Sequence, residues 1–317
     1  MRKAIVFVLA ASVCLWSQAT WAAGKYPQKP ITMIIPWDAG GGTDLVHRAA
    51  SKSAEEHLKQ PIVIVNKPGA GGVIGSKMVE NADPDGYTLG GITSTVLVTQ
   101  YTAPNPTDWS KYEPVFTVTY DPGAIAVRKD SQWKSLKELI AYAKANPKKV
   151  KVGNAGIGAL HHLFAVGLET EAGVEFHHIP YKGAGAAKVA LLGNEVDAVS
   201  ADTGAFYAQV VSGQLRLLGI AADQRFSGFP DTPTYKEQGV PLTIGMWRLV
   251  AAPKGTPKEV IKILVDAYSK AMKSQEIQKK QGQWILVGRG AEETGAVMKR
   301  DDQMWKRIAQ KYLLQKK

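Results

Sequence analysis

The segment ITMIIPWDAGGGTD at residues 31–44 sets the expected fold of this chain. Its apolar run is typical of a buried parallel strand, consecutive glycines follow, and Thr43 and Asp44 then offer side chains suited to capping a helix N-terminus. The segment therefore predicts a strand, a glycine turn and a helix. Glycine permits positive φ and close approach of a ligand, while the helix directs free N–H groups and the positive end of its dipole into the same space. Such a place favours an anion.

The same unit recurs along the chain. A short buried strand followed by a glycine turn that opens a helix is expected again at residues 61–75, 149–162 and 176–190. This repetition predicts an α/β protein with parallel strands and right-handed crossovers. Amphipathic helices are expected at residues 44–60, 135–146, 256–274 and 293–316. At the second of these, Ser135 and Glu138 would form a capping box.

Two places indicate a passage between domains. Residues 113–130 are expected to form two strands separated by a break at residues 121–123, and the chain would cross to a second domain near Ala124. Proline and glycine punctuate residues 230–245, where the chain would return. The expected organisation is a signal peptide at residues 1–22, a first domain of residues 23–124 plus 246–317, and a second domain of residues 125–245.

The first 22 residues have the pattern of a secretory signal peptide. Arg2 and Lys3 precede an apolar stretch, and the small residues Thr20 and Ala22 stand at −3 and −1 of a cut after Ala22. We therefore expect the mature chain to leave the cytoplasm, and the resemblance described below implies the periplasm. The single cysteine, Cys14, lies inside this segment, so the mature chain would hold no disulfide and would depend on its packed core for stability.

The chain is basic, with a formal net charge of +11. Its basic residues are dispersed along the sequence and are not interleaved with aromatic side chains on one face. The charge therefore indicates solubility and a general attraction to anions, and no nucleic-acid partner is expected.

The sequence holds no motif with the residues and spacing that a cofactor site, a metal site or a catalytic nucleophile requires. Gly69, Gly71 and Gly75 are spaced as GxGxxxG instead of the dinucleotide pattern GxGxxG, and no Gly-Lys-Ser/Thr phosphate loop or GxSxG elbow occurs. The histidines at residues 161–162 and 177–178 are adjacent pairs, whose rings would point in different directions. We expect no catalytic residue, no cofactor and no metal ion.

Three hydroxyl residues, Thr93, Ser94 and Thr95, follow the strand expected at residues 87–92. They would lie at the carboxyl end of that strand, where open α/β sheets place their ligands. A periplasmic hydrolase that uses Ser94 or Thr95 remains an alternative to a binding protein, although no base for either hydroxyl is recognisable.

Seven segments are distributed in order along nearly the whole mature chain: YPQKPITMIIPWDAGGGTD, VNKPGAGGVIGS, ADPDGYTLG, VGNAGIGALHH, IPYKGAGAAKVALLGNEVDA, QLRLLGIAADQR with PDTPTYKEQG, and APKGTP. In these segments the chain resembles the Bug family, the TctC-like periplasmic receptors of tripartite tricarboxylate transporters. The resemblance implies a two-lobed periplasmic binding protein (Venus flytrap) with two doubly wound α/β domains and a ligand cleft between them. It implies a receptor that closes on a small carboxylate and delivers it to the membrane components of the transporter. We expect the receptor to be a monomer. A module that senses the ligand for a membrane kinase is a further alternative function.

The resemblance also implies which residues bind the ligand. N–H groups of the first loop would hold a carboxylate, hydroxyls would line the same wall, and a second glycine loop would oppose them. These residues are Trp37, Asp38, Ala39, Gly40, Gly41, Gly42, Thr43 and Asp44; Thr93, Ser94 and Thr95; Asn154, Ala155, Gly156, Ala159 and His161; Lys182 and Gly183; and Asp202.

Three of these positions affect which ligand is expected. Ala155 and Ala159 replace the hydroxyl residues common in the family, so binding there would rest on main-chain N–H groups and Asn154. Trp37 replaces the usual phenylalanine and offers a wide flat wall, or else packs beneath the loop. Asp202 would repel a second ligand carboxylate and favour an amino, amide or hydroxyl group, unless it only caps the helix that follows.

Overall fold

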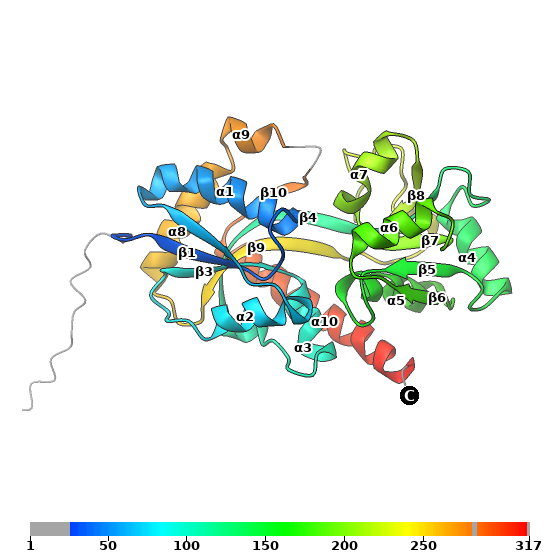
Figure 1. The fold of residues 1–317 in the computed structure, drawn as a ribbon, viewed down its shortest axis with the longest axis horizontal. Helices are drawn as coiled ribbons and strands as arrows, with labels where there is room; N and C mark the ends of the chain where they lie inside the picture. Colours follow the sequence, from blue (N-terminus) through cyan, green and yellow to red (C-terminus); the bar gives the residue numbers. More distant parts are fainter. Residues whose placement is uncertain (1–25, 281–283, 316–317) are drawn as a thin grey trace, which may run out of the picture.

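The computed structural model describes residues 26–280 and 284–315 (Figure 1). The predicted signal peptide lies outside the described residues. Two α/β lobes lie side by side and are joined in the middle by strands β4 and β9. The two-lobed α/β fold expected from the sequence is confirmed.

Lobe 1 contains β1 (Ile31–Ile35), α1 (Gly42–Leu58), β2 (Ile62–Asn66), α2 (Val73–Glu80), β3 (Thr88–Thr93), α3 (Thr95–Thr102), β9 (Gly245–Pro253), α8 (Lys258–Ala271), α9 (Gln275–Gln278) and β10 (Leu286–Arg289). Lobe 2 contains α4 (Leu136–Ala145), β5 (Lys151–Asn154), α5 (Leu160–Ala172), β6 (His177–Pro180), α6 (Ala184–Leu192), β7 (Ala198–Asp202), α7 (Thr203–Val211) and β8 (Leu215–Ile220). Strand β4 (Tyr112–Arg128) and helix α10 (Ala291–Gln315) reach both lobes. None of the helices that the structure describes combines the length and the apolar character needed to cross a bilayer.

The sheet of lobe 1 has the strand order β2-β1-β3-β9-β4, and β10 also pairs with β4. Strands β1, β2 and β3 are parallel, whereas β9 runs antiparallel to both of its neighbours. Side chains alternate between the two faces: Val250 of β9 packs with α1 and α8, and Leu249 packs with α2, α3 and α10. Both faces of the sheet are therefore covered by helices, as a doubly wound sheet requires.

Lobe 2 repeats this arrangement. Strand β5 is parallel to β6 and β7, and β4 runs antiparallel to β7 and β8. Helices α4 and α5 cover one face, and α6 and α7 cover the other. Helix α4 begins as expected, because the Ser135 hydroxyl accepts a hydrogen bond from the Glu138 N–H at 3.2 Å.

The strand break expected at residues 121–123 is wrong, because β4 is one continuous strand. Its first part pairs with β9 as far as Pro122, and its last part pairs with β7 and β8 from Gly123 onward. The missing N–H of Pro122 falls where β4 changes partners, so an isolated Pro-Gly pair does not end the strand here. This change of partners and the start of β9 at Gly245 lie near the expected crossings at residues 124 and 246, whose positions stay predictions.

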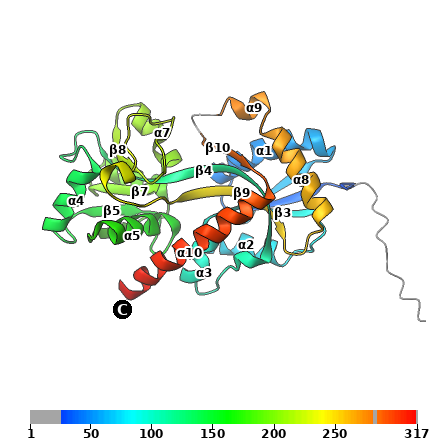
Figure 2. The same cartoon turned by 180° about the vertical axis from the view of Figure 1, so that it is seen from behind.

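Helix α10 starts on lobe 1 and ends against lobe 2 (Figure 2). Near its start, Thr294 shares a hydrogen bond with Thr117 of β4. Farther along, the ring of Trp305 stacks on Phe164 of α5, with centroids 5.9 Å apart. Its last turns therefore contact the second lobe, although the sequence placed the whole helix in the first domain.

Candidate functional site

The carboxyl ends of the parallel strands face the junction in both lobes. In lobe 1, Thr93 at the end of β3 pairs with Arg248, which lies near the beginning of β9. In lobe 2, Asp202 at the end of β7 pairs with Gly123, where β4 enters that lobe. Because β1 is parallel to β3 and β5 is parallel to β7, the glycine turns that follow β1 and β5 also open at this junction.

The first glycine loop leads into helix α1 earlier than expected. The helix begins at Gly42 with Gly41 as its N-cap and has no side-chain cap, so the expectation that Thr43 or Asp44 caps it is wrong. The glycines let the backbone enter the helix directly. The N–H groups of Gly42, Thr43 and Asp44 have no hydrogen-bond partner among the residues that the structure describes. They are available to an anion.

Asp44 shapes this loop from within the first turn of α1. Its carboxylate accepts hydrogen bonds from the Gly40 N–H and from Nε of Arg48, each at 2.8 Å. The Asn66 side-chain amide donates both to Asp44 at 2.9 Å and to the carbonyl of Trp37 at 3.0 Å. Although burial opposes ionisation, these donors hold the pKa of Asp44 below its ordinary value. Asp44 therefore braces the loop and is not a free acceptor.

The side chain of Trp37 lies against the second glycine turn. A Cβ atom on Gly72 would stand 2.9 Å from the indole ring, and Gly72 has a φ of +92°. Only glycine allows this close approach. Trp37 thus packs beneath the loop, and its Nε1 is buried without a hydrogen-bond partner from residues 26–280 or 284–315. Asp38 and Ala39 are exposed at the loop's tip.

The hydroxyls expected to line the wall are buried and bonded to one another and to the backbone. Thr93 donates to Thr95 at 3.0 Å, and Ser94 donates to the carbonyl of Gly245 at 3.2 Å. Ser94 therefore ties the end of β3 to the start of β9. Among the described residues, neither Ser94 nor Thr95 has a histidine or a carboxylate as a hydrogen-bond partner.

The opposing loop of lobe 2 satisfies part of its own backbone. The Gly156 N–H donates to the Asn154 carbonyl at 3.0 Å, and the Ala159 N–H donates to the Gly156 carbonyl at 3.3 Å. Helix α5 then begins after Ala159, again without a side-chain cap. Asn154 is fully buried, and its Oδ1 has no hydrogen-bond partner within the described ranges; Ala155 is half-buried. What this loop can offer a ligand is the first turn of α5 and the Asn154 side chain.

The next turn of lobe 2 follows β6. Gly183 is the N-cap of α6, which also has no side-chain cap. A Cβ atom on Gly183 would meet nothing within 4 Å, so the space beside it is open. Lys182 is exposed.

Asp202 and His161 form a buried pair at the end of β7. Nε2 of His161 lies 3.0 Å from Oδ2 of Asp202, and Oδ1 of Asp202 accepts the Ala205 N–H at 3.3 Å. Asp202 is therefore the N-cap of α7 as well as the partner of His161. Burial alone would raise the pKa of Asp202, but the hydrogen bond from His161 and the charge of Arg248 lower it.

Sequence reasoning missed Arg248 and Asp121, which form an ion pair beneath the first loop. Arg248 is 6% exposed; its Nε donates to Thr43 and its Nη1 donates to Thr119, each at 3.4 Å. Burial raises the pKa of Asp121 to about 6, although Arg248 opposes this shift. A lone arginine inside the apolar stretch GMWRLVAAP is a signal that singles out Arg248, but nothing in the sequence links it to Asp121.

Two of the other histidines, His162 and His178, make hydrogen-bond contacts within lobe 2, whereas His177 is exposed. Nδ1 of His162 accepts the Gly158 N–H at 3.0 Å, and Nε2 of His178 lies 3.2 Å from Glu169. Burial lowers the pKa of His162 to about 3, so its ring stays neutral and can accept. Within the described ranges, no group of three or more His, Cys, Asp and Glu residues could hold a metal ion.

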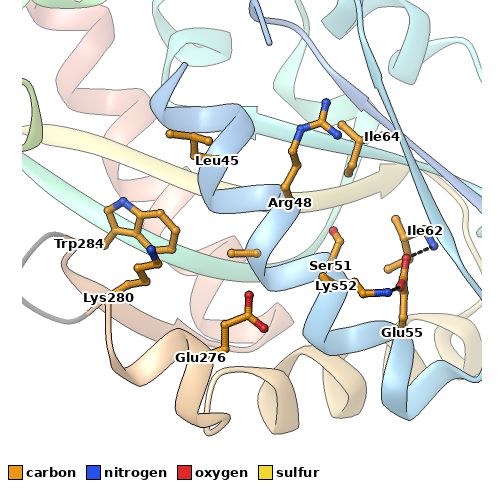
Figure 3. Close-up of a pocket in the computed structure, with 11 residues that line it drawn as sticks. Leu45, Arg48, Ser51, Lys52, Glu55, Ile62, Ile64, Glu276, Lys280 and Trp284 are labelled. Carbon is orange, nitrogen blue, oxygen red and sulfur yellow. Dashed lines mark hydrogen bonds and ion pairs between the residues drawn. The ribbon is translucent and has the colours of Figure 1, made fainter. Parts of the chain in front are cut away.

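A separate hollow of about 520 Å³ lies on the outer side of α1, between β2 and α9 (Figure 3). Figure 3 shows Trp284, Lys280 and Glu276 on one side of it and α1 on the other. Its charged side chains include Lys52 and Glu55, which pair with each other at 2.9 Å. None of the predicted ligand-binding residues lines this hollow.

The chain is similar in sequence and in fold to several known proteins. A family model described as the tripartite tricarboxylate transporter family receptor matches residues 46–312. A UPF0065 protein from the gbd 5' region of Cupriavidus necator is 40% identical over 79% of this chain and 76% of its own length. The crystal structure of a TctC solute-binding protein from Polaromonas has a TM-score of 0.79 at 37% identity, covering 90% of this chain and 99% of that one.

Two further structures were solved with ligands. MatC from Rhodopseudomonas palustris with bound malate has a TM-score of 0.78 at 26% identity and covers 90% of this chain and 100% of its own. Another R. palustris protein, solved with adipate, has a TM-score of 0.79 at 26% identity and covers 90% of this chain and 98% of its own. Both ligands are small dicarboxylates.

Proposed function

The chain belongs to the tripartite tricarboxylate transporter family of receptors, and from this premise we propose that it is a periplasmic solute-binding receptor that captures a small carboxylate between its two lobes. Capture and release without chemical change is the proposed activity, and no catalytic residue is assigned. The membrane components of a tripartite transporter are the proposed recipients of the ligand, and we expect the receptor to act as a monomer.

The observation that carries this proposal is a pair of uncapped helix N-termini at one junction. Helix α1 of lobe 1 follows β1, helix α5 of lobe 2 follows β5, and neither has a side-chain cap. Free N–H groups and the positive end of the helix dipole favour an anion at each of them. A ligand that touches both would stabilise the closed form of two lobes joined by strands.

The ligands of related proteins support the carboxylate assignment. The malate and adipate structures have the same fold over nine-tenths of this chain. A charge-assisted hydrogen bond contributes about 1.5 to 3 kcal/mol, so three or four of them, less the cost of closure, match the roughly 8 kcal/mol of micromolar affinity.

The far end of the ligand is proposed to carry a hydrogen-bond donor. Asn154 Oδ1 and Thr203 Oγ1 are both buried without a partner in the described part of the chain, and both lie at the edge of lobe 2 that faces the junction. Buried polar groups normally have hydrogen-bond partners, so a bound molecule or an ordered water would supply the missing hydrogen bonds. The charge of Asp202 nearby favours a hydroxyl or amino group over a second carboxylate.

A ligand panel tests the proposal. Malate, adipate, citrate, benzoate, aspartate and glutamate are compared by thermal shift and by calorimetry on the mature chain. We expect reversible binding of at least one acid, with the acid recovered unchanged by mass spectrometry. Hydrolysis or other turnover would point to an enzyme, and failure of every acid to bind would contradict the receptor. Mass spectrometry of small molecules that co-purify with the protein extends the panel without assuming the ligand.

A further inference from the structure

Arg248 occupies a position that would otherwise belong to the apolar core of lobe 1. Strand alternation places it on the same face of β9 as Val250 and Ala252, which pack beneath α1 and α8. It lies in register with Thr93 on β3 and with Thr119 on β4. Burying a guanidinium there carries a desolvation cost, which is offset only by well-placed partners.

The protein supplies partners for two of the three guanidinium nitrogens. Nε donates to Thr43, and Nη1 donates to Thr119 and Asp121. Nη2 has no hydrogen-bond partner among the described residues, and it lies 3.3 Å from the position that a Cβ atom on Gly42 would occupy. The free nitrogen is thus directed to the first turn of α1, where the backbone N–H groups are also unpartnered.

Two carboxylates lie near Arg248, and neither is hydrogen-bonded to Nη2. Asp121 is its ion-pair partner through Nη1, and Asp202, whose pKa the charge of Arg248 lowers, is hydrogen-bonded within lobe 2. His47 on α1 is fully buried beside Arg248, and burial together with the charge of Arg248 lowers the pKa of His47 to about 3, so this ring is neutral. Asp44 is engaged by Arg48, Gly40 and Asn66.

We propose that Arg248 contacts the ligand, with Nη2 and the N–H groups of the first turn of α1 together receiving a ligand carboxylate. Asp121 is a positioning residue that fixes the guanidinium and, by its charge, limits how strongly the anion is held. This inference rests on the proposed receptor function and deepens it. It makes the lobe 1 end of the site cationic, whereas the lobe 2 end offers Asn154 and Thr203.

A purely structural role for Arg248 makes different predictions. If Arg248 only neutralises Asp121, removing either charge should destabilise the junction between the lobes to the same extent. If Arg248 holds the ligand, the two changes act in opposite directions, because losing the negative charge of Asp121 strengthens the attraction between Arg248 and an anion.

Calorimetry with malate and adipate separates the two roles. We compare the wild-type chain, Asp121→Asn, and Asp121→Asn combined with Arg248→Gln, which leaves no unpaired charge. Asp121→Asn should bind the acid as tightly as the wild type or a few-fold more tightly. The double variant should bind about 10- to 100-fold more weakly than Asp121→Asn, as expected for the loss of one charge-assisted contact. Equal affinity of Asp121→Asn and the double variant, within twofold, would overturn the inference.

A measurement on the unmodified protein guards against a variant that fails to fold. The side-chain nitrogen signals of ¹⁵N-arginine-labelled wild type are recorded with and without malate or adipate, and Arg248→Lys assigns the Arg248 signals by their loss. The Arg248 signals should shift on binding, while those of Arg128, which lies in lobe 2 and pairs with Asp130, should not. An unmoved Arg248 signal in ligand-saturated protein contradicts the inference and leaves the receptor function standing. Failure of the wild type to bind either acid or any member of the wider panel counts against the receptor function itself.

Discussion

A Cβ atom on Gly42 would stand 3.3 Å from Nη2 of Arg248, although the two residues are 206 positions apart in the chain. The N-terminus of α1 and the guanidinium of Arg248 are thus within contact distance of each other. The relationship identifies the side of Gly42 on which a ligand carboxylate would meet a positive charge.

Replacing Gly42 with valine should weaken carboxylate binding. The added side chain would press on Nη2 of Arg248 and cover the free N–H groups of the first turn. Binding is measured by calorimetry with malate and adipate, and we expect a loss of at least 10-fold, corresponding to about 1.4 kcal/mol. Gly295→Ala in α10 is the control, since its Cβ would make an ordinary contact at 3.4 Å with Pro114. Retained affinity in Gly42→Val would remove this loop from the site.

Replacing Asn154 with leucine should weaken the binding of acids with a donor at the far end more than the binding of acids without one. The fully buried Oδ1 has no partner among the residues in the described part of the chain, so a ligand hydroxyl or amino group would lose its acceptor, at a cost of about 1 to 3 kcal/mol. Malate and succinate differ by one hydroxyl and form the matched ligand pair. A loss of equal size for both would show that Asn154 shapes the loop without contacting the ligand.

Replacing Asp202 with asparagine separates its charge from its cap. Asparagine caps a helix about as well as aspartate, so α7 should keep its start, while the negative charge disappears. We expect the free amino acid aspartate, whose ammonium group complements Asp202, to bind more weakly to the variant than to the wild type. Malate should bind to the variant equally well or better. Competition between the two acids, followed by calorimetry, measures the change. If binding of both acids is unchanged, Asp202 acts on the helix and on His161 alone.

Acidification should destabilise the fold through His162. Burial lowers the pKa of this ring to about 3, whereas an unfolded histidine titrates near 6.5, so the unfolded state binds more protons between these values. The neutral His162 ring therefore contributes its full share of the folding stability above about pH 6.5. This contribution is lost as the pH falls from about 6.5 towards 3, by up to about 1.4 kcal/mol per pH unit. In wild type the midpoint of denaturation should fall between pH 7 and pH 5, and His162→Gln should make this fall smaller. His57→Gln, at an exposed position, is the control and should leave the fall unchanged. Parallel curves for wild type and His162→Gln would contradict the assignment.

Replacing Trp305 with alanine should destabilise both lobes together. Its side chain is fully buried and stacks on Phe164, so the cavity would cost about 3 to 5 kcal/mol. Leu314→Ala, on the same helix but 71% exposed, should change the free energy of unfolding by less than about 0.5 kcal/mol. Urea unfolding followed by tryptophan fluorescence and by circular dichroism measures both. A small loss in Trp305→Ala would mean that α10 contributes little to holding lobe 2.

Local sequence reasoning succeeded where a signal is confined to a few neighbouring residues. The start of α4 at Ser135 and the α/β repeat of strand, glycine turn and helix are of this kind. It failed at Pro122, where a local turn signal was overridden because β4 changes partners there. It also failed at Thr43 and Asp44, because the glycine run allowed the helix to begin earlier. The predicted ligand-binding residues and the domain boundaries remain predictions.

The sequence by itself determined the fold class and the family, because periodicity, glycine turns and family motifs are properties of short stretches of chain. The tertiary structure alone decided which side chains meet at the junction. Arg248 reaches Thr43 across 205 positions, and Asp202 reaches His161 across 41. Such contacts depend on strand register and on the crossing of β4 between lobes, and no local pattern in the sequence encodes them.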